Sequence, residues 1–129
     1  MYKHPNFKNN LRHWTNRSSF ANLLYDIYDG DVWKTFKDEP FDNNSALFFQ
    51  QEKADSHLGL ILNLDWFQPY SGVTYSIDVI YAAIANLPRD ICFKHENMLI
   101  LDILPEPNES NLHKINNYLS LIVDNLNSL

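Results

Sequence analysis

Three aspartates lie in apolar stretches that have the composition of β-strands, and they are the first candidates for chemistry. Asp65 follows LGLILNL directly, Asp78 lies within TYSIDVIYAAIA, and Asp102 lies within NMLILDIL. A buried carboxylate costs several kcal/mol unless a charged or hydrogen-bonding group meets it. Two or three carboxylates that converge at a sheet can hold Mg²⁺ or Mn²⁺ for phosphoryl transfer. The alternative for each is an aspartate that caps a turn or faces solvent.

Other kinds of site find less support in the sequence. The five histidines show neither HxxxH nor HExxH spacing, and the single cysteine, Cys92, excludes a cysteine metal cluster and a disulfide framework. The three glycines are scattered, so there is no phosphate-binding loop, and no serine has the GxSxG setting, although composition leaves Ser-His-Asp chemistry open. Asp29 and Asp31 flank Gly30, but the remaining ligands of a calcium loop are missing, which favours the end of a helix.

An amphipathic helix is predicted ahead of these aspartates. From Ser18 to Gly30 one apolar stripe has helical spacing, formed by Phe20, Leu23, Leu24, Ile27 and Tyr28. Ser18 or Ser19 would cap its start, and Gly30 would end it. DVWKTF (31–36) is predicted to be a short turn or a continuation that places Trp33 and Phe36 in the core, and 38–45 a loop.

Three strands and a final helix are predicted to follow. The strands cover 58–67, 74–85 and 97–104, and a helix capped by Ser110 or Asn111 carries the apolar stripe Leu112, Ile115, Leu119, Ile122, Val123 and Leu126. Links this short favour an antiparallel meander with the helix across one face. We therefore expect an α+β fold: a basic N-terminal loop over 1–16, then one domain over 17–129, with a helical lead-in (17–50) and a strand-strand-strand-helix part (57–129).

Charge and composition limit the partners and the compartment. The net charge is −6, but residues 1–20 carry four bases and no acid, and residues 21–129 carry six bases and sixteen acids. An acidic body is a poor platform for DNA, so DNA contact by the chain alone would fall to the basic head. The start has no signal-peptide core, and no apolar run reaches the roughly 20 residues of a membrane span. The sequence predicts a protein that is neither secreted nor in a membrane.

Several blocks of the chain resemble the CACTA-type (En/Spm-like) transposases, most closely copies found in fungi. They are RHWTNRSSFANLLYDIYDGDVWKTF, LGLILNLDWFQPYSGVTYSIDVIYAAIANLPRDICFKHENMLILDILPEP and the helix that ends IVDNLNSL. The match covers roughly residues 12–129 in the right order and spacing, and LNLDWFQPY and NLPRDICFKHENMLIL are its most distinctive parts.

The resemblance implies a partial RNase H-like core, a fold that opens with three antiparallel strands and a helix. Asp65 matches the acid of the family's DWFQP block, so the resemblance makes Asp65 the catalytic, metal-binding residue. It further implies Mg²⁺ or Mn²⁺ in the intact family site, DNA as the partner of the intact enzyme, and a nuclear location for a functional copy, with a cytoplasmic one otherwise. No family role carries over to Asp78 or Asp102, and Glu106 replaces the glycine of the family's PGP turn.

The resemblance also implies that the family's other catalytic acids lie on a later strand and helix, and we expect a truncated or decayed transposase that is inactive alone. The first strand would then present an unpaired apolar edge and promote self-association.

Two alternatives stay open. One is a domesticated binding module that uses the strand edge or the basic N-terminus, and the other is a small metal-dependent hydrolase built from Asp65, Asp78 and Asp102.

Overall fold

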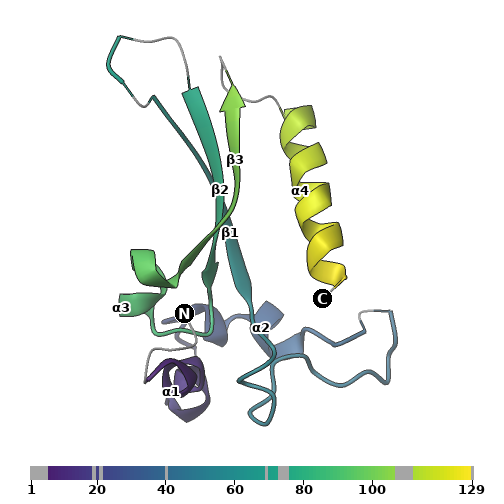
Figure 1. The fold of residues 1–129 in the computed structure, drawn as a ribbon. Helices are drawn as coiled ribbons and strands as arrows, with labels where there is room; N and C mark the ends of the chain where they lie inside the picture. Colours follow the sequence, from purple (N-terminus) through teal and green to yellow (C-terminus); the bar gives the residue numbers. More distant parts are fainter. Residues whose placement is uncertain are drawn as a thin grey trace. The chain divides into compact units, whose positions relative to one another are not determined.

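The computed structural model describes residues 6–18, 20, 22–39, 41–68, 70–72, 76–106 and 112–128. The chain forms two compact units: residues 1–61 with 83–98, and residues 62–82 with 99–129. Figure 1 shows the elements of both units. None of the three boundaries between these units falls at the predicted junction between 16 and 17, and the single domain over 17–129 stays a prediction.

The α+β class and the order of strands are confirmed. One antiparallel sheet has the strand order β1-β2-β3, built from β1 (Leu60–Phe67), β2 (Ser76–Ile84) and β3 (Met98–Glu106). The helix α4 (Leu112–Asn127) follows β3, as its apolar stripe predicts (Figure 1). The strand ends lie within two residues of the predicted ones, and the end of β1 at Phe67 coincides with its prediction. The proposed caps, Ser110 and Asn111, lie outside the described residues.

The first unit has a core made by short helices around the end of β2. The helix α1 (Phe7–Leu11) buries Phe7 and Leu11 against Ile84, Leu87 and Cys92. The prediction of a loop over 1–16 is therefore wrong for 7–16, which α1 and a 3₁₀ helix, η1 (His13–Asn16), occupy. The reason is that two apolar residues four apart suffice to dock one helical turn on a core, although they are too few to show a period.

A second cluster of buried side chains lies in the same unit. The helix α2 (Asp31–Thr35) places Trp33 in it, where the indole stacks on Phe49 with ring centroids 3.7 Å apart. The Tyr28 hydroxyl lies 2.7 and 3.0 Å from the backbone oxygens of Ala85 and Leu87, and its one proton can be donated to either. The prediction of a buried Trp33 is confirmed, whereas Phe36 is exposed. The short helix α3 (Arg89–Cys92) and η3 (His95–Asn97) then lead into β3 and were not predicted.

The predicted helix over 18–30 is absent from the described part of that segment, which contains one 3₁₀ turn, η2 (Ile27–Asp29). Asn22 has a φ of 68°, in the left-handed region, which interrupts a right-handed helix. The carboxylate of Asp29 accepts the backbone N–H groups of Tyr25 and Asp26, at 2.9 and 3.0 Å. Such side-chain bonds offer the backbone an alternative to the helical ladder. Most of the stripe therefore faces solvent, and Leu24 is 80% exposed.

Candidate metal site on the edge strand

The position of Asp65 depends on the pairing of β1 with β2. The backbone N–H of Ala85 donates to the oxygen of Gly59 at 2.8 Å, and the side chain of Asn63 is hydrogen-bonded to the Tyr81 hydroxyl. Both contacts give the same antiparallel register, in which odd-numbered residues of β1 face odd-numbered residues of β2. Facing residues in a sheet share one side of it.

Asp65 lies in this register opposite Val79, on the side of the sheet that carries Asn63 and Tyr81. Its side chain is exposed, and among the described residues none makes a hydrogen bond or an ion pair with its carboxylate. The carboxylate therefore keeps its hydration, and the cost that a buried acid would have to offset does not arise. An acid at the end of an apolar run is explained here by its place on an edge strand.

Asp78 lies on the opposite side of the sheet. It faces Trp66 across the register and is 2% exposed. Ile80 and Ala82 of the same strand lie on the same side and are also buried. Since successive side chains alternate between the two sides of a strand, Asp65 and Asp78 point away from each other. They cannot coordinate one ion, which contradicts the hypothesis of a hydrolase built from all three aspartates.

Asp102, on β3, is half-buried, and its carboxylate accepts the backbone N–H of Ile103 at 2.8 Å. Over the described residues no group of three or more histidine, cysteine, aspartate or glutamate side chains is placed to hold a metal ion. Asp65, Asp78 and Asp102 therefore do not form a three-carboxylate metal site in the part of the chain that the structure describes.

The residues around Asp65 fit a divalent cation as one ligand only. Mg²⁺ is commonly held by one or two carboxylates, several waters and the phosphates of a substrate. The exposed Asp65 carboxylate can supply the first of these, and the amide oxygen of Asn63 is two residues away on the same side. Two-metal catalysis places the ions about 3.5–4 Å apart between shared carboxylates, which needs more acids than β1 and β2 offer on this side.

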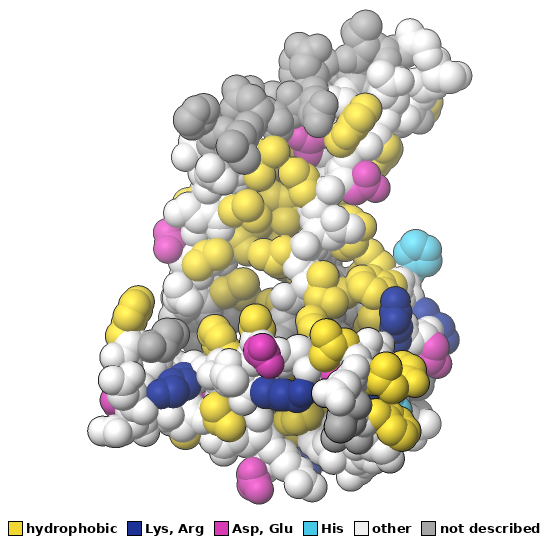
Figure 2. Space-filling model, turned by 180° about the vertical axis from the view of Figure 1, so that it is seen from behind, with side chains coloured by type: hydrophobic (Ala, Val, Ile, Leu, Met, Phe, Trp, Pro, Cys, Tyr) yellow, Lys and Arg dark blue, Asp and Glu magenta, His cyan; other side chains and the backbone are white. Residues whose placement is uncertain are grey.

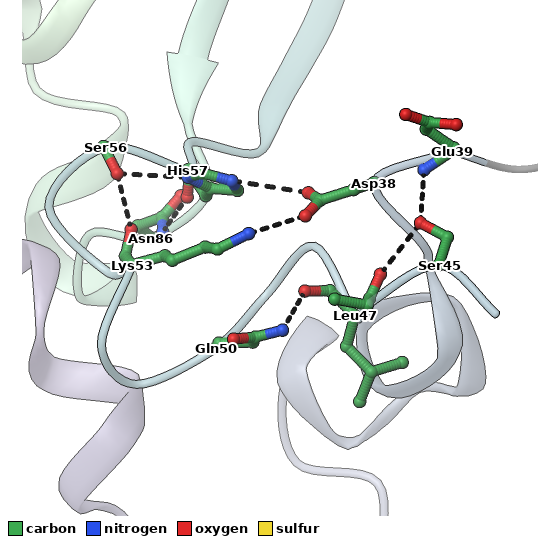
Figure 3. Close-up of polar contacts among 10 residues, drawn as sticks. Asp38, Glu39, Ser45, Leu47, Gln50, Lys53, Ser56, His57 and Asn86 are labelled. Atoms are coloured by element: carbon green, nitrogen blue, oxygen red, sulfur yellow. Dashed lines mark hydrogen bonds and ion pairs between the residues drawn. The ribbon is translucent and has the colours of Figure 1, made fainter.

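A Ser-His-Asp arrangement, which the sequence left open without naming residues, occurs in the first unit. His57 Nδ1 lies 3.1 Å from the Ser56 hydroxyl, and His57 Nε2 lies 3.3 Å from Asp38 Oδ1 (Figure 3). Lys53 Nζ contacts the other carboxylate oxygen of Asp38 at 2.6 Å. Sequence reasoning missed this set because the three residues belong to loops, and only the adjacent pair Ser56–His57 was visible as a signal.

The contacts of these residues indicate a structural role and not a catalytic one. The Ser56 hydroxyl is also placed to donate to the Lys53 carbonyl oxygen at 3.2 Å, so its one proton has two competing acceptors. The hydrogen bond from Lys53 lowers the pKa of Asp38, which therefore serves as a counter-ion for a lysine as well as a partner for His57. Figure 3 shows these contacts closing the loop between Asp38 and His57.

Arg17 and Asp29 form the most buried ion pair among the described residues. Two guanidinium nitrogens contact the two carboxylate oxygens at 2.6 and 3.0 Å, and the side chains are 18% and 5% exposed. The bond from Arg17 lowers the pKa of Asp29 to about 2. Arg12 pairs similarly with Asp55. Two of the four bases of the N-terminal segment are therefore engaged with acids of the same unit.

Neither a family model, nor a curated protein, nor a solved structure matches the chain. The resemblance to CACTA-type transposases therefore stays a prediction from the sequence. Within the described residues, no helix has both the length and the apolar character that crossing a membrane requires.

Proposed function

We propose that this chain forms part of the catalytic core of a CACTA-type DNA transposase, a metal-dependent enzyme that cleaves and transfers DNA strands, and that Asp65 is one ligand of its metal site. The observation that carries the proposal is the edge position of β1. In an RNase H-like sheet the first strand is central, with the second strand on one side and a later parallel strand on the other. β1 has β2 on one side, while its other edge is open among the described residues, at the place that such a strand would occupy.

The side chain of Asp65 has the properties that a ligand needs. It is exposed, it makes no bond within the described part of the chain, and it sits on a strand that β2 holds in place. A bound Mg²⁺ or Mn²⁺ would polarise a DNA phosphate and help to activate the attacking hydroxyl. Asp65 would orient that cation, and Asn63 lies beside it on the same side of the sheet.

Residues 1–129 are proposed to be inactive in strand cleavage on their own. β1 and β2 offer one carboxylate on the Asp65 side, whereas a two-metal site needs at least two. DNA binding is proposed to be weak for the same chain, because its net charge is −6 and Arg12 and Arg17 are already paired. A nuclear location would follow from work on DNA, as part of the same proposal.

Paramagnetic Mn²⁺ tests the role of Asp65 without an activity assay. Substoichiometric Mn²⁺ added to the ¹⁵N-labelled dilute chain should broaden the amide signals of residues 64–66, and Asp65→Asn should abolish that broadening. Asp90→Asn, which removes an exposed acid of α3, is the matched control and should leave it intact. Broadening of 64–66 that persists in Asp65→Asn, or that never occurs in the unaltered chain, would refute the assignment.

A second candidate function is an interaction module, and the exposed side chains of β1 favour it. Leu60, Leu62, Leu64, Trp66 and Phe67 are each at least 37% exposed. Figure 2 shows hydrophobic side chains gathered on the visible surface of the molecule. Exposed apolar edge strands are ready templates for pairing with another chain. The basic N-terminus, the other route considered, is less suitable because Arg12 and Arg17 are paired.

A further inference from the structure

The open edge of β1 presents a regular set of backbone groups. The Gly59 oxygen accepts from Ala85, so the N–H and C=O groups of Gly59 and of every second residue after it face β2. The backbone groups of Leu60, Leu62, Leu64 and Trp66 consequently point away from β2. Among the described residues no further strand pairs with this edge, because β1 is the terminal strand of the order β1-β2-β3, and all residues of β1 except Ile61 are exposed.

β1 also lacks the features that usually keep edge strands apart. Proteins protect such edges with lysine, proline, bulges or inward-pointing charges. Residues 60–67 contain no lysine and no proline, and Asp65 is their one charged residue. The edge is therefore suited to accept another strand.

We propose that the strand accepted there is β1 of a second copy of this chain, paired antiparallel in the register that centres on Leu64. This inference deepens the second candidate function by naming its partner. A two-fold axis perpendicular to the sheet keeps each side of the sheet in common, so residues of equal parity face each other. Leu64 faces Leu64 of the second copy, and Leu62 faces Trp66.

The sequence of β1 matches itself best in this register. On the other side of the sheet, Ile61 faces Phe67, and Asn63 faces Asp65, so apolar residues meet apolar ones and polar residues meet polar ones. One N–H of the Asn63 amide is used on Tyr81, and the second can donate to the facing Asp65 carboxylate. A register centred on Asn63 would set Ile61 against Asp65, and one centred on Asp65 would set two carboxylates face to face, which is unfavourable.

Pairing would bury apolar surface that the single chain leaves in water. Leu62, Leu64 and Trp66 are 42%, 38% and 52% exposed, and they meet across the axis in the proposed dimer. Their facing residues on β2, among them the buried Ala82 and Ile80, already form the core of the second unit. The dimer would thus extend that core across a six-stranded sheet.

Disulfide cross-linking of single-cysteine variants tests the proposed register directly. Facing residues of a hydrogen-bonded antiparallel pair have Cα atoms about 5.5 Å apart, within the 4.4–6.8 Å that a disulfide spans. Under mild oxidation Leu64→Cys should give a covalent dimer. Leu62→Cys is the matched control: in this register its counterpart lies four residues along the strand, about 13 Å away, so it should give several-fold less. The natural Cys92 is buried and supplies the background in the unaltered chain.

A second measurement keeps the proposal testable if a cysteine variant folds poorly. Sedimentation of the unaltered chain should show a dimer that dissociates on dilution, and Leu64→Lys should yield the monomer, because two ammonium groups would meet at the axis. Leu121→Lys, at an exposed leucine of α4, should leave the dimer intact. The proposal would be overturned if the unaltered chain stayed monomeric at every concentration up to its solubility limit. Equal cross-linking of Leu62→Cys and Leu64→Cys would also overturn it. The Mn²⁺ experiment is independent of this result, because it is made on the dilute chain.

Discussion

At the scale of single residues, exposure decides which acids can act on a ligand. Asp65 is exposed on an edge strand and keeps its carboxylate available, whereas Asp78 is buried on the other side of the same sheet. Asp29 is also buried, but a bidentate arginine satisfies it. Asp65 and Asp78 show that a place in an apolar run does not determine whether an acid is buried, because burial also depends on whether its strand lies at the edge or in the middle of the sheet.

The Arg17–Asp29 pair should make stability depend on acidic pH. The folded pKa of Asp29 is about 2, below its ordinary value of 3.8, because Arg17 donates to the carboxylate. A group with a lowered folded pKa stabilises the fold above its ordinary pKa and loses that contribution as the pH falls toward the folded value. Urea unfolding should therefore show stability falling between about pH 4 and pH 2. Asp29→Asn should be less stable at pH 7 and show a flatter decline, and an unchanged slope would contradict the assignment.

At the scale of elements, the strands and the last helix were predicted well, whereas the helix over 18–30 was not. The three strands and α4 were correct to within one or two residues at most ends, because each has an apolar run with a clear period and turn residues around it. The helix over 18–30 was wrong although its stripe was regular. Of its stripe only Tyr28 is buried, whereas Phe20, Leu23, Leu24 and Ile27 are exposed, and the Asp29 carboxylate binds backbone N–H groups of the segment.

Asn22 provides a test of that correction. Its φ of 68° lies in the left-handed region, where alanine is unfavourable and glycine is tolerated. Asn22→Ala should therefore lower the free energy of unfolding by about 1 kcal/mol. Asn22→Gly should change it by much less. Thermal unfolding measures both. If Asn22→Ala were the more stable variant, residues 18–30 would be helical in solution.

Gly59, which directly precedes β1, is packed closely against aromatic side chains. A Cβ at Gly59 would lie 2.9 Å from a ring carbon of Trp33 and 3.2 Å from one of Phe49. The two rings are stacked, so neither can move without disturbing the other. Gly59→Ala should cost about 1–3 kcal/mol by overpacking, as urea unfolding would show. Gly72→Ala tests a different cause, since Gly72 has open space around it but a φ of 85°.

At the scale of the whole molecule, the candidate site could be predicted only in part. The sequence identified Asp65 and its strand, and it predicted an open edge on that strand. Which other acids share a side of the sheet with Asp65 depends on how the strands pair, and no local pattern contains that pairing. The Ser56, His57 and Asp38 contacts were not predicted either, since loops bring them together. The proposed transposase role and the proposed dimer both depend on the same open edge, one through its acid and the other through its backbone and apolar side chains.

The most direct test of the transposase proposal is a crystal structure of the chain soaked in Mn²⁺, with the metal located by its anomalous scattering. The proposal predicts a Mn²⁺ ion bound to a carboxylate oxygen of Asp65, on a strand that has β2 as its one neighbour within the same chain. Mn²⁺ bound at other carboxylates and absent from Asp65 would contradict it.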